Sequence, residues 1–160
     1  MKIKIFSVGG TIDKVYFDQL SDYKVGGPSI REILDGFPLN LEYEIDSFIR
    51  KDSLDMTDED RNLVLEKVQA ETCPNILITH GTDTMVETAR LLKQVQDKTV
   101  VLTGAMEPAG FLHSDAVFNV GCAITAVQTM QPGVYIAMNG RIYDPDKVEK
   151  DRNSMRFREI

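Results

Sequence analysis

Hydroxyl-bearing residues follow apolar segments at several places in the chain, and these are the residues whose types allow chemistry. The stretch FSVGGTIDK places Thr11 directly after two glycines at the end of an apolar run, and an acid and a base follow. Ser53 lies in RKDSLDM and Thr82 in HGTDTM, each again after an apolar run. A hydroxyl is a poor nucleophile until a base or a hydrogen-bond relay removes its proton. The pattern therefore allows nucleophilic catalysis by Thr11, Ser53 or Thr82.

Four side chains are candidates to activate these hydroxyls, and each also has an ordinary structural interpretation. The candidates are Tyr16, Tyr23, Asp83 and Lys150. The tyrosines are equally well explained as partly buried aromatics with a solvated hydroxyl, and Lys150 as a solvated surface lysine. Asp83 fits the first turn of a helix, where the helix dipole favours an acid, and Thr82 fits an N-cap. Residue types alone leave these interpretations open.

Other chemistries find less support in the pattern. Neither His80 nor His113 has a second ligand at metal-binding spacing, so we expect no metal site. The Gly-Gly-Thr turn matches neither the dinucleotide-binding fingerprint nor the P-loop pattern, and nucleotide binding is only weakly supported.

The composition suits one compact domain over residues 1–160, because 42% of the residues are apolar. The net charge is −7 and no run of lysines and arginines is present, which argues against a nucleic-acid partner but leaves room for a positive pocket. No apolar run approaches membrane-spanning length, so we expect no membrane partner.

The cysteines and the N-terminus bear on the compartment. Cys73 and Cys122 lie far apart in helical patterns and are interpreted as buried free thiols, which fits reducing surroundings. The chain enters a strand pattern at once, without an apolar leader and cleavage site. These features predict a cytoplasmic protein.

Strand and helix patterns alternate along the chain. Strands are predicted over 2–8, 41–50, 75–79, 98–103 and 133–138. Helices are predicted over 28–36, 57–72, 84–96 and 114–130. NILITH and TVVLTG are apolar throughout, as parallel strands covered on both faces should be. The alternation predicts an α/β sheet, in which ligands bind beyond the carboxyl ends of the strands, where the hydroxyls lie.

Local signals add three expectations. Thr57, followed by three acids, is typical of a helix N-cap. Asn139-Gly140 predicts a hairpin turn. The tail from Asp144 onward is polar, which favours partial mobility.

Three stretches, VGGTIDK, ITHGTDTM and VVLTGAMEP, resemble the bacterial-type L-asparaginase/glutaminase family of threonine amidohydrolases. SDYKVG is similar to the family's mobile tyrosine loop, and DSLDMTD to its serine segment. GGTI and HGTDT together are highly specific, and the likeness runs across essentially the whole chain. It implies a three-layer α/β domain with a mainly parallel, flavodoxin-like sheet and helices on both faces.

The resemblance covers only the amino-terminal domain of the usual two-domain enzyme. A short single-domain branch of the family is the nearest likeness, without the carboxy-terminal domain. Because the chain runs past its last motif, we expect a complete small protein.

Site roles follow from the resemblance residue by residue. Thr11 is the expected primary nucleophile, assisted by Tyr23 on a loop over 13–27 that closes on substrate; Tyr16 in the same loop is the second choice for this role. Lys150, held by Asp83, is expected to act as a base or to activate a water molecule beside the hydroxyl of Thr82. The expected catalytic residues are Thr11, Tyr23, Thr82, Asp83 and Lys150. The expected substrate-binding residues are Gly10, Asp52, Ser53, Gly81, Thr82, Asp83 and Ala105.

The implied reaction is hydrolysis of L-asparagine to L-aspartate and ammonia through an acyl-threonine, without a cofactor, in a homo-oligomer. Ser53 would bind the α-carboxylate and Asp83 the α-amino group, while N–H groups around Thr82 and Ala105 stabilise the oxyanion. Leu54 departs from the family, which has glutamine or glutamate at this position near the α-amino group. Another small amide substrate, or an amino-acid sensor without turnover, are the alternatives.

Overall fold

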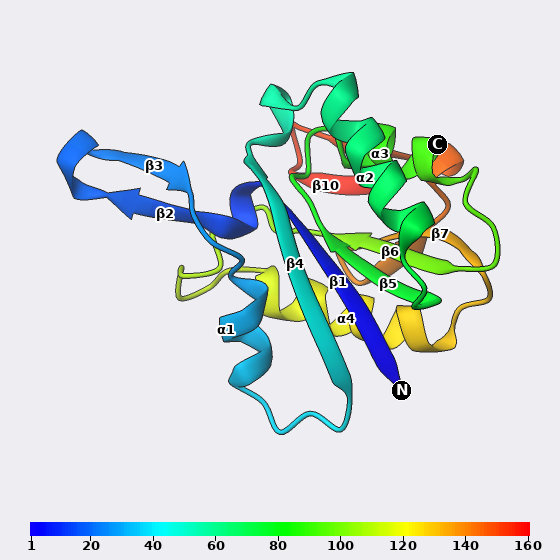
Figure 1. Ribbon diagram of the computed structural model, residues 1–160. Helices are drawn as coiled ribbons and strands as arrows, with labels where there is room; N and C mark the ends of the chain where they lie inside the picture. Colours follow the sequence, from blue (N-terminus) through cyan, green and yellow to red (C-terminus); the bar gives the residue numbers. More distant parts are fainter.

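The computed structural model describes residues 1–160, and a six-stranded sheet forms its centre (Figure 1). Its strands, in spatial order, are β4 (Glu42–Lys51), β1 (Lys2–Gly9), β5 (Asn75–Thr79), β6 (Thr99–Thr103), β7 (Gly133–Met138) and β8 (Arg141–Tyr143). The first five are parallel, and β8 joins β7 antiparallel. Numbered by chain order, the parallel strands run 2-1-3-4-5, which is the flavodoxin-like order. The predicted fold class is confirmed.

Four helices cover the two faces of this sheet and make three layers (Figure 1). They are α1 (Ile30–Asp35), α2 (Asp58–Ala70), α3 (Met85–Leu92) and α4 (Ala116–Thr129). Ile78 and Leu102 pack in the core under α2 and α3, whereas the preceding residues Leu77 and Val101 pack in the core under α1 and α4. Successive strand residues face opposite sides, so strands covered on both faces are apolar throughout.

The element boundaries follow local chemistry. Thr57 and Asp60 form the expected capping box at the start of α2. α3 ends at Leu92, before the predicted limit of 96, because i→i−3 bonds such as Val95 N–H to the Leu92 carbonyl tighten the chain into a turn. Asn139 and Gly140 have φ values of 53° and 77°, and they form the predicted hairpin turn between β7 and β8.

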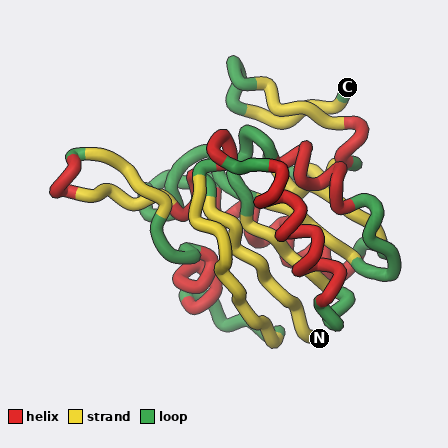
Figure 2. Tube along the Cα trace, turned by 45° about the horizontal axis from the view of Figure 1, so that its top comes forward, coloured by secondary structure: helices red, strands yellow, loops and turns green.

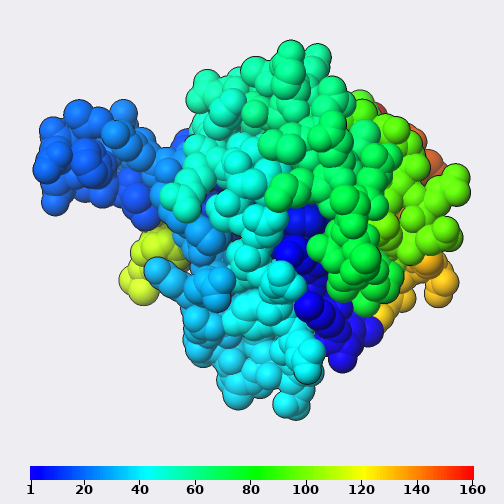
Figure 3. All heavy atoms as spheres, viewed as in Figure 1, coloured from blue at the N-terminus to red at the C-terminus, as the bar shows by residue number.

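Two small hairpins lie outside the main sheet. β2 (Lys14–Phe17) and β3 (Asp22–Val25) project from the body as a separate arm (Figures 1 and 3). β9 (Val148–Asp151) and β10 (Arg156–Glu159) form the second hairpin near the C-terminus (Figure 2). The expectation of a partly mobile tail is wrong for this segment, since Val148 and Phe157 are buried in the core under α2 and α3.

The two cysteines are free, as predicted, but neither is fully buried. Cys122 lies on α4, whereas Cys73 lies in the turn between α2 and β5 rather than in a helix. α2 stops at Ala70 because Glu71 takes an extended conformation. None of the helices is long and apolar enough to cross a membrane.

Candidate active site

Three turns from different parts of the chain pack against one another at the carboxyl edge of the sheet. Gly10, with φ of 94°, follows β1, and a Cβ there would overlap the backbone of Gly81. A Cβ on Gly81 would in turn lie 2.5 Å from the Cβ and Oγ of Ser53. Only glycine permits such an approach of two backbones and a side chain. The structure therefore brings together the predicted substrate-binding residues Gly10, Ser53 and Gly81.

Lys150, Thr82 and Asp83 form a compact cluster beside these turns. The Lys150 Nζ lies 2.7 Å from Thr82 Oγ1 and 2.9 Å from Asp83 Oδ1. Its side chain is only 8% exposed, because β9 carries it in from the C-terminal hairpin. The interpretation of Lys150 as a solvated surface lysine is wrong. Residues far apart in sequence meet here, as the sequence pattern predicted.

His80 holds the loop that carries Thr82 and Asp83. Its Nδ1 lies 2.7 Å from the Gly81 carbonyl and its Nε2 lies 2.8 Å from Thr88 Oγ1. A carbonyl only accepts, so Nδ1 bears the proton and Nε2 accepts from the Thr88 hydroxyl. Burial lowers the pKa of His80 to about 4, with a contribution from the charge of Arg61, and the bond to Gly81 only partly opposes this. The ring is therefore neutral at pH 7.

The serine segment is fixed from two sides. Ser53 is buried, and the Thr84 hydroxyl donates to its carbonyl at 2.9 Å while the Thr84 N–H reaches its Oγ at 3.4 Å. Thr84 stands at the N-cap position of α3, but its hydroxyl makes this contact instead of capping the helix. These two bonds tie Ser53 to the loop after β5.

Asp52, the residue before the serine, is held by a cation. Lys14 Nζ lies 2.6 Å from Asp52 Oδ2, and the Leu54 N–H donates to Oδ1. Burial acts to raise the pKa of Asp52, but the bonds from Lys14 and Leu54 and the charges of Lys14 and Lys150 outweigh it and hold the pKa below its usual range. Leu54 itself is 61% exposed on the rim of the site.

Thr11 and Tyr23 are not brought together in this structure. Thr11 opens a single 3-10 turn, η1 (Thr11–Asp13), at the end of β1. Tyr23 lies on β3 and is 44% exposed; its ring packs edge-on against Tyr16 at 5.5 Å and against Phe111 at 5.9 Å between centroids. The predicted loop over 13–27 is thus largely a β-hairpin, and no hydrogen bond joins Tyr23 to Thr11.

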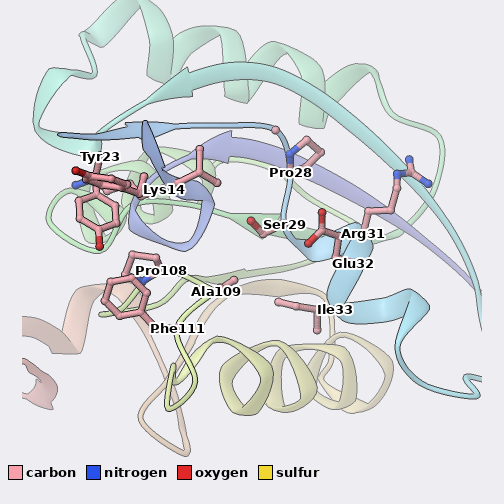
Figure 4. Close-up of a pocket in the computed structure, with 14 residues that line it drawn as sticks. Lys14, Tyr23, Pro28, Ser29, Arg31, Glu32, Ile33, Pro108, Ala109 and Phe111 are labelled. Atoms are coloured by element: carbon pink, nitrogen blue, oxygen red, sulfur yellow. The ribbon is translucent and has the colours of Figure 1, made fainter. Parts of the chain in front are cut away.

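A cleft of about 710 Å³ lies beneath this hairpin (Figure 4). Tyr23, Phe111 and Pro108 form one wall, and Ser29 lies between this wall and the side chains of Arg31 and Glu32. The hairpin therefore stands over open space rather than closing on the threonines.

Ala105 is buried just beyond the end of β6. Its loop is anchored by α4, where Asn119 Nδ2 donates to the Gly104 carbonyl at 2.9 Å and the Met106 N–H donates to Asp115. These bonds on both sides of Ala105 hold the backbone next to the other turns in a set orientation.

Two charged residues of the site were missed by the sequence reasoning. The sequence marks Lys14 only as the last residue of the stretch VGGTIDK. Its contact with Asp52 was not predicted, although Lys14 directly follows the turn that carries Thr11. Arg152 Nε lies 3.3 Å from Asp83 Oδ1. Its only signal in the sequence was its place two residues after Lys150, and in the structure it begins the turn that follows β9. No three His, Cys, Asp or Glu side chains are grouped so that they could hold a metal ion.

Fold and site together define a flavodoxin-like α/β domain whose carboxyl edge carries a threonine, aspartate and lysine cluster. Residues 2–157 match the asparaginase family in its N-terminal domain. The chain belongs to the asparaginase family.

Individual relatives agree with this assignment. The chain is 32% identical to the probable periplasmic L-asparaginase of Haemophilus influenzae and 31% identical to L-asparaginase 2 of Escherichia coli, in each case over 92% of this chain and 46% of the relative. The structure of the thermostable L-asparaginase from Thermococcus kodakarensis superposes with a TM-score of 0.85 at 27% identity, over 100% of this chain and 51% of that one. This chain thus spans about half the length of the relatives it matches.

Proposed function

We propose that the protein is an amidohydrolase that converts L-asparagine to L-aspartate and ammonia. The observation that carries the proposal is the buried Lys150 ammonium, within 2.7 Å of Thr82 Oγ1 and 2.9 Å of Asp83 Oδ1. Burying a lysine is unfavourable unless it is paired, and here its partners are a hydroxyl and a carboxylate at the ligand-binding edge. Membership of the asparaginase family supports the same assignment.

The proposed reaction has two steps. The Thr11 oxygen attacks the side-chain amide carbon, the C–N bond breaks, and the proton released from the hydroxyl leaves with ammonia. Water then cleaves the acyl-threonine ester, which returns the hydroxyl and releases the carboxylate. N–H groups at Thr82 and Ala105 would stabilise the oxyanion of each step. Thr82, already in contact with Lys150, is the alternative nucleophile.

Lys150 takes the proton-handling role in this scheme, and Asp83 holds it in place. Tyr23 would assist Thr11 after the β2–β3 hairpin moves inward from the position seen here, with Tyr16 as the alternative. Closing elements of this kind exclude water and complete a catalytic site on substrate binding.

Substrate recognition in the proposal rests on Ser53 for the α-carboxylate and on Asp83 for the α-ammonium. Asp83 is shared with Lys150 and Arg152, and Leu54 offers no hydrogen bond. A different small amide is therefore the second candidate substrate. An amino-acid sensor without turnover is a third candidate, which the buried lysine disfavours because simple binding does not need it.

We also propose a homo-oligomer. Exposed apolar side chains of α4, Val117 and Phe118, border a cleft of about 530 Å³ that Ile142 also lines. Contiguous exposed apolar surface of this kind is typical of protein contacts. Light scattering across a concentration series tests this, and a monomer at all concentrations would contradict it.

A cytoplasmic location is proposed on the basis of the two cysteines, which are both free. Unpaired thiols are usual where the surroundings are reducing. Fractionation of the native host tests this, and recovery outside the cytoplasm would overturn it.

Ammonia release from a panel of amides tests the proposed activity. The panel holds L-asparagine, L-glutamine and succinamate, and the assay compares wild type with Thr11→Ala. We expect release from L-asparagine that Thr11→Ala abolishes. Release only from succinamate would select the second candidate substrate class. Binding of L-asparagine by calorimetry without any release would select the sensor.

A further inference from the structure

Asp13 is a buried carboxylate two residues beyond Thr11, and the proposed chemistry does not use it. The residue is 1% exposed. Ser7, on β1, donates its hydroxyl to Asp13 Oδ2 at 3.0 Å. The N–H of Ser29, the residue that precedes α1, donates to Asp13 Oδ1 at 2.8 Å. The Asp13 side chain thus ties β1 to the start of α1.

The backbone of Asp13 makes two further bonds. Its N–H donates to the Gly10 carbonyl at 3.1 Å, which closes the turn that holds Thr11. Its carbonyl accepts the Gly26 N–H at 2.7 Å. Since β2 begins at Lys14 and β3 ends at Val25, both roots of the β2–β3 hairpin meet at this residue.

Charge makes this arrangement costly for the protein. Burial raises the pKa of Asp13 to about 6, although the bonds from Ser29 and Ser7 and the charge of Arg50 on β4 lower it in part. Lys14, the adjacent cation, is committed to Asp52. An asparagine would fill the same space without a buried charge at neutral pH. Unfavourable ionisable groups are concentrated at functional sites.

We propose that Asp13 is a positioning residue that sets the Thr11 turn and the root of the β2–β3 hairpin in one orientation toward β1 and α1. Through these contacts it controls where Tyr23 stands relative to Thr11. The consequence for turnover rests on the proposed function, whereas the consequence for the hairpin does not. Ser29, which donates to Asp13, lines the same cleft as Tyr23 (Figure 4).

The test compares three variants by kinetics and by hydrogen exchange of residues 14–25. Asp13→Ala removes both side-chain contacts. Asp13→Asn keeps the acceptor for the Ser29 N–H and removes the charge. Asp18→Ala makes the same truncation at an exposed carboxylate of the same hairpin and serves as the control.

We expect Asp13→Ala to lower kcat by about 10- to 100-fold, because small misplacement of reacting groups has effects of that size. KM should change by less than about three-fold, since Ser53 and Asp83 are untouched. Exchange of residues 14–25 should accelerate. Asp13→Asn should restore most of kcat and of the protection, and Asp18→Ala should alter neither.

Several outcomes would overturn the positioning role. One is a folded Asp13→Ala protein with unchanged hairpin exchange. Another is Asp13→Asn as inactive as Asp13→Ala with normal exchange, which would mean that the charge acts directly. If Asp13→Ala does not fold, Ser7→Ala removes one donor and should give the same effects at smaller size; no effect would count against the proposal. Were wild type to hydrolyse no amide, the proposed function would fail while the exchange comparison still decided the role of Asp13.

Discussion

The Thr82 and Lys150 side of the candidate site and the Thr11 and Tyr23 side lie on the same sheet edge, but they are held differently. On the first side Thr82 and Lys150 already touch, and His80 bonds to the Gly81 carbonyl in the loop that carries Thr82. On the second side Thr11 stands on a closed turn, while Tyr23 projects on a hairpin that contacts the body through Phe111.

This difference indicates a division of labour. Preorganised groups cost nothing to align at the moment of reaction, which suits proton handling by Lys150. Under the proposed function, movement of the hairpin would admit substrate and then exclude water. Each side also has one residue whose pKa is strongly shifted by burial, His80 or Asp13, and four measurements separate the two sides.

The largest expected effect belongs to the fixed side. Replacing the buried lysine, Lys150→Met, keeps the apolar stem and removes the charge that contacts Thr82. General acid–base groups contribute about 10²–10⁴-fold, so kcat for L-asparagine should fall by that factor while circular dichroism is unchanged. Lys147→Met, at an exposed lysine of the same segment, should change kcat by less than about two-fold. Equal effects of the two substitutions would contradict the assignment.

The next effect concerns the pH dependence of the free energy of unfolding. Asp13 and His80 are expected to change it in opposite directions as pH rises. The folded pKa of Asp13 is raised from 3.8 to about 6, so its stabilising contribution is present at low pH and is lost as pH rises through 6. The folded pKa of His80 is lowered from 6.5 to about 4, so its contribution is present above pH 6.5 and is lost as pH falls toward 4.

In wild type the two contributions oppose each other, and single substitutions reveal them. Asp13→Asn lacks the contribution that wild type loses as pH rises from 4 to 7. Its free energy of unfolding should therefore rise relative to wild type by up to ~3 kcal/mol over this range, since the pKa shift is about two units at 1.36 kcal/mol each. His80→Gln should show the reverse slope relative to wild type. Urea unfolding at several pH values measures both. Differences that run in the same direction would show that one of the two assignments is wrong.

A smaller effect is expected in substrate affinity at the rim. Because Leu54 offers the substrate ammonium no hydrogen bond and Asp83 is shared with Lys150 and Arg152, L-asparagine should have a high KM. A charged hydrogen bond contributes about 1.5–3 kcal/mol, so Leu54→Gln should lower KM by roughly 10- to 100-fold. Leu63→Gln, at an exposed leucine of α2, is the control. A micromolar KM of wild type for L-asparagine would contradict this explanation of weak substrate binding at Leu54.

The smallest effect concerns the hairpin. Some amide hydrogens can exchange only after the ligand has left. A ligand present at ten times its Kd slows their exchange by about ten-fold. Residues 14–25 should gain that protection when L-aspartate is added, whereas β5 and β6, already buried, should not change. Unchanged exchange of the hairpin at saturating ligand would remove its closing role.

The strands of the sheet could be predicted from sequence because covered parallel strands leave a plain signature, whereas their flavodoxin-like order was implied by the family resemblance. NILIT and TVVLT lie where uninterrupted apolar runs placed them. The helix ends were less accurate, since the end of α3 depends on turn bonds of Lys93 and Val95 that no periodicity encodes. The β2–β3 hairpin was missed because its short strands are mostly exposed, without a buried face to impose alternation of polar and apolar residues.

The candidate site likewise has residues that the sequence predicts and contacts that it does not. Residues beside glycines that follow strands were predictable, because such turns meet at one edge. The contacts of Lys14, Arg152 and Asp13 were not, since an ion pair or a buried carboxylate depends on which turns pack together. Residue types made Lys150 one candidate among four, and only the resemblance gave it a specific role; its burial depends on Val148 and Phe157, two apolar residues in a charged segment.

The placement of Lys150 on β9 has a consequence for the order of synthesis. Strands β1 to β7 are complete at Met138, before the lysine has been made. The C-terminal hairpin then docks through Val148 and Phe157, with the Phe157 N–H bonded to Asn139 Oδ1 at 2.8 Å and the Tyr143 hydroxyl to the Phe157 carbonyl at 3.0 Å. Domains form while the chain emerges, and elements can open as separate units. A chain whose synthesis has reached only Met138 therefore contains the serine segment but not the lysine, so under the proposed function it cannot turn over the amide.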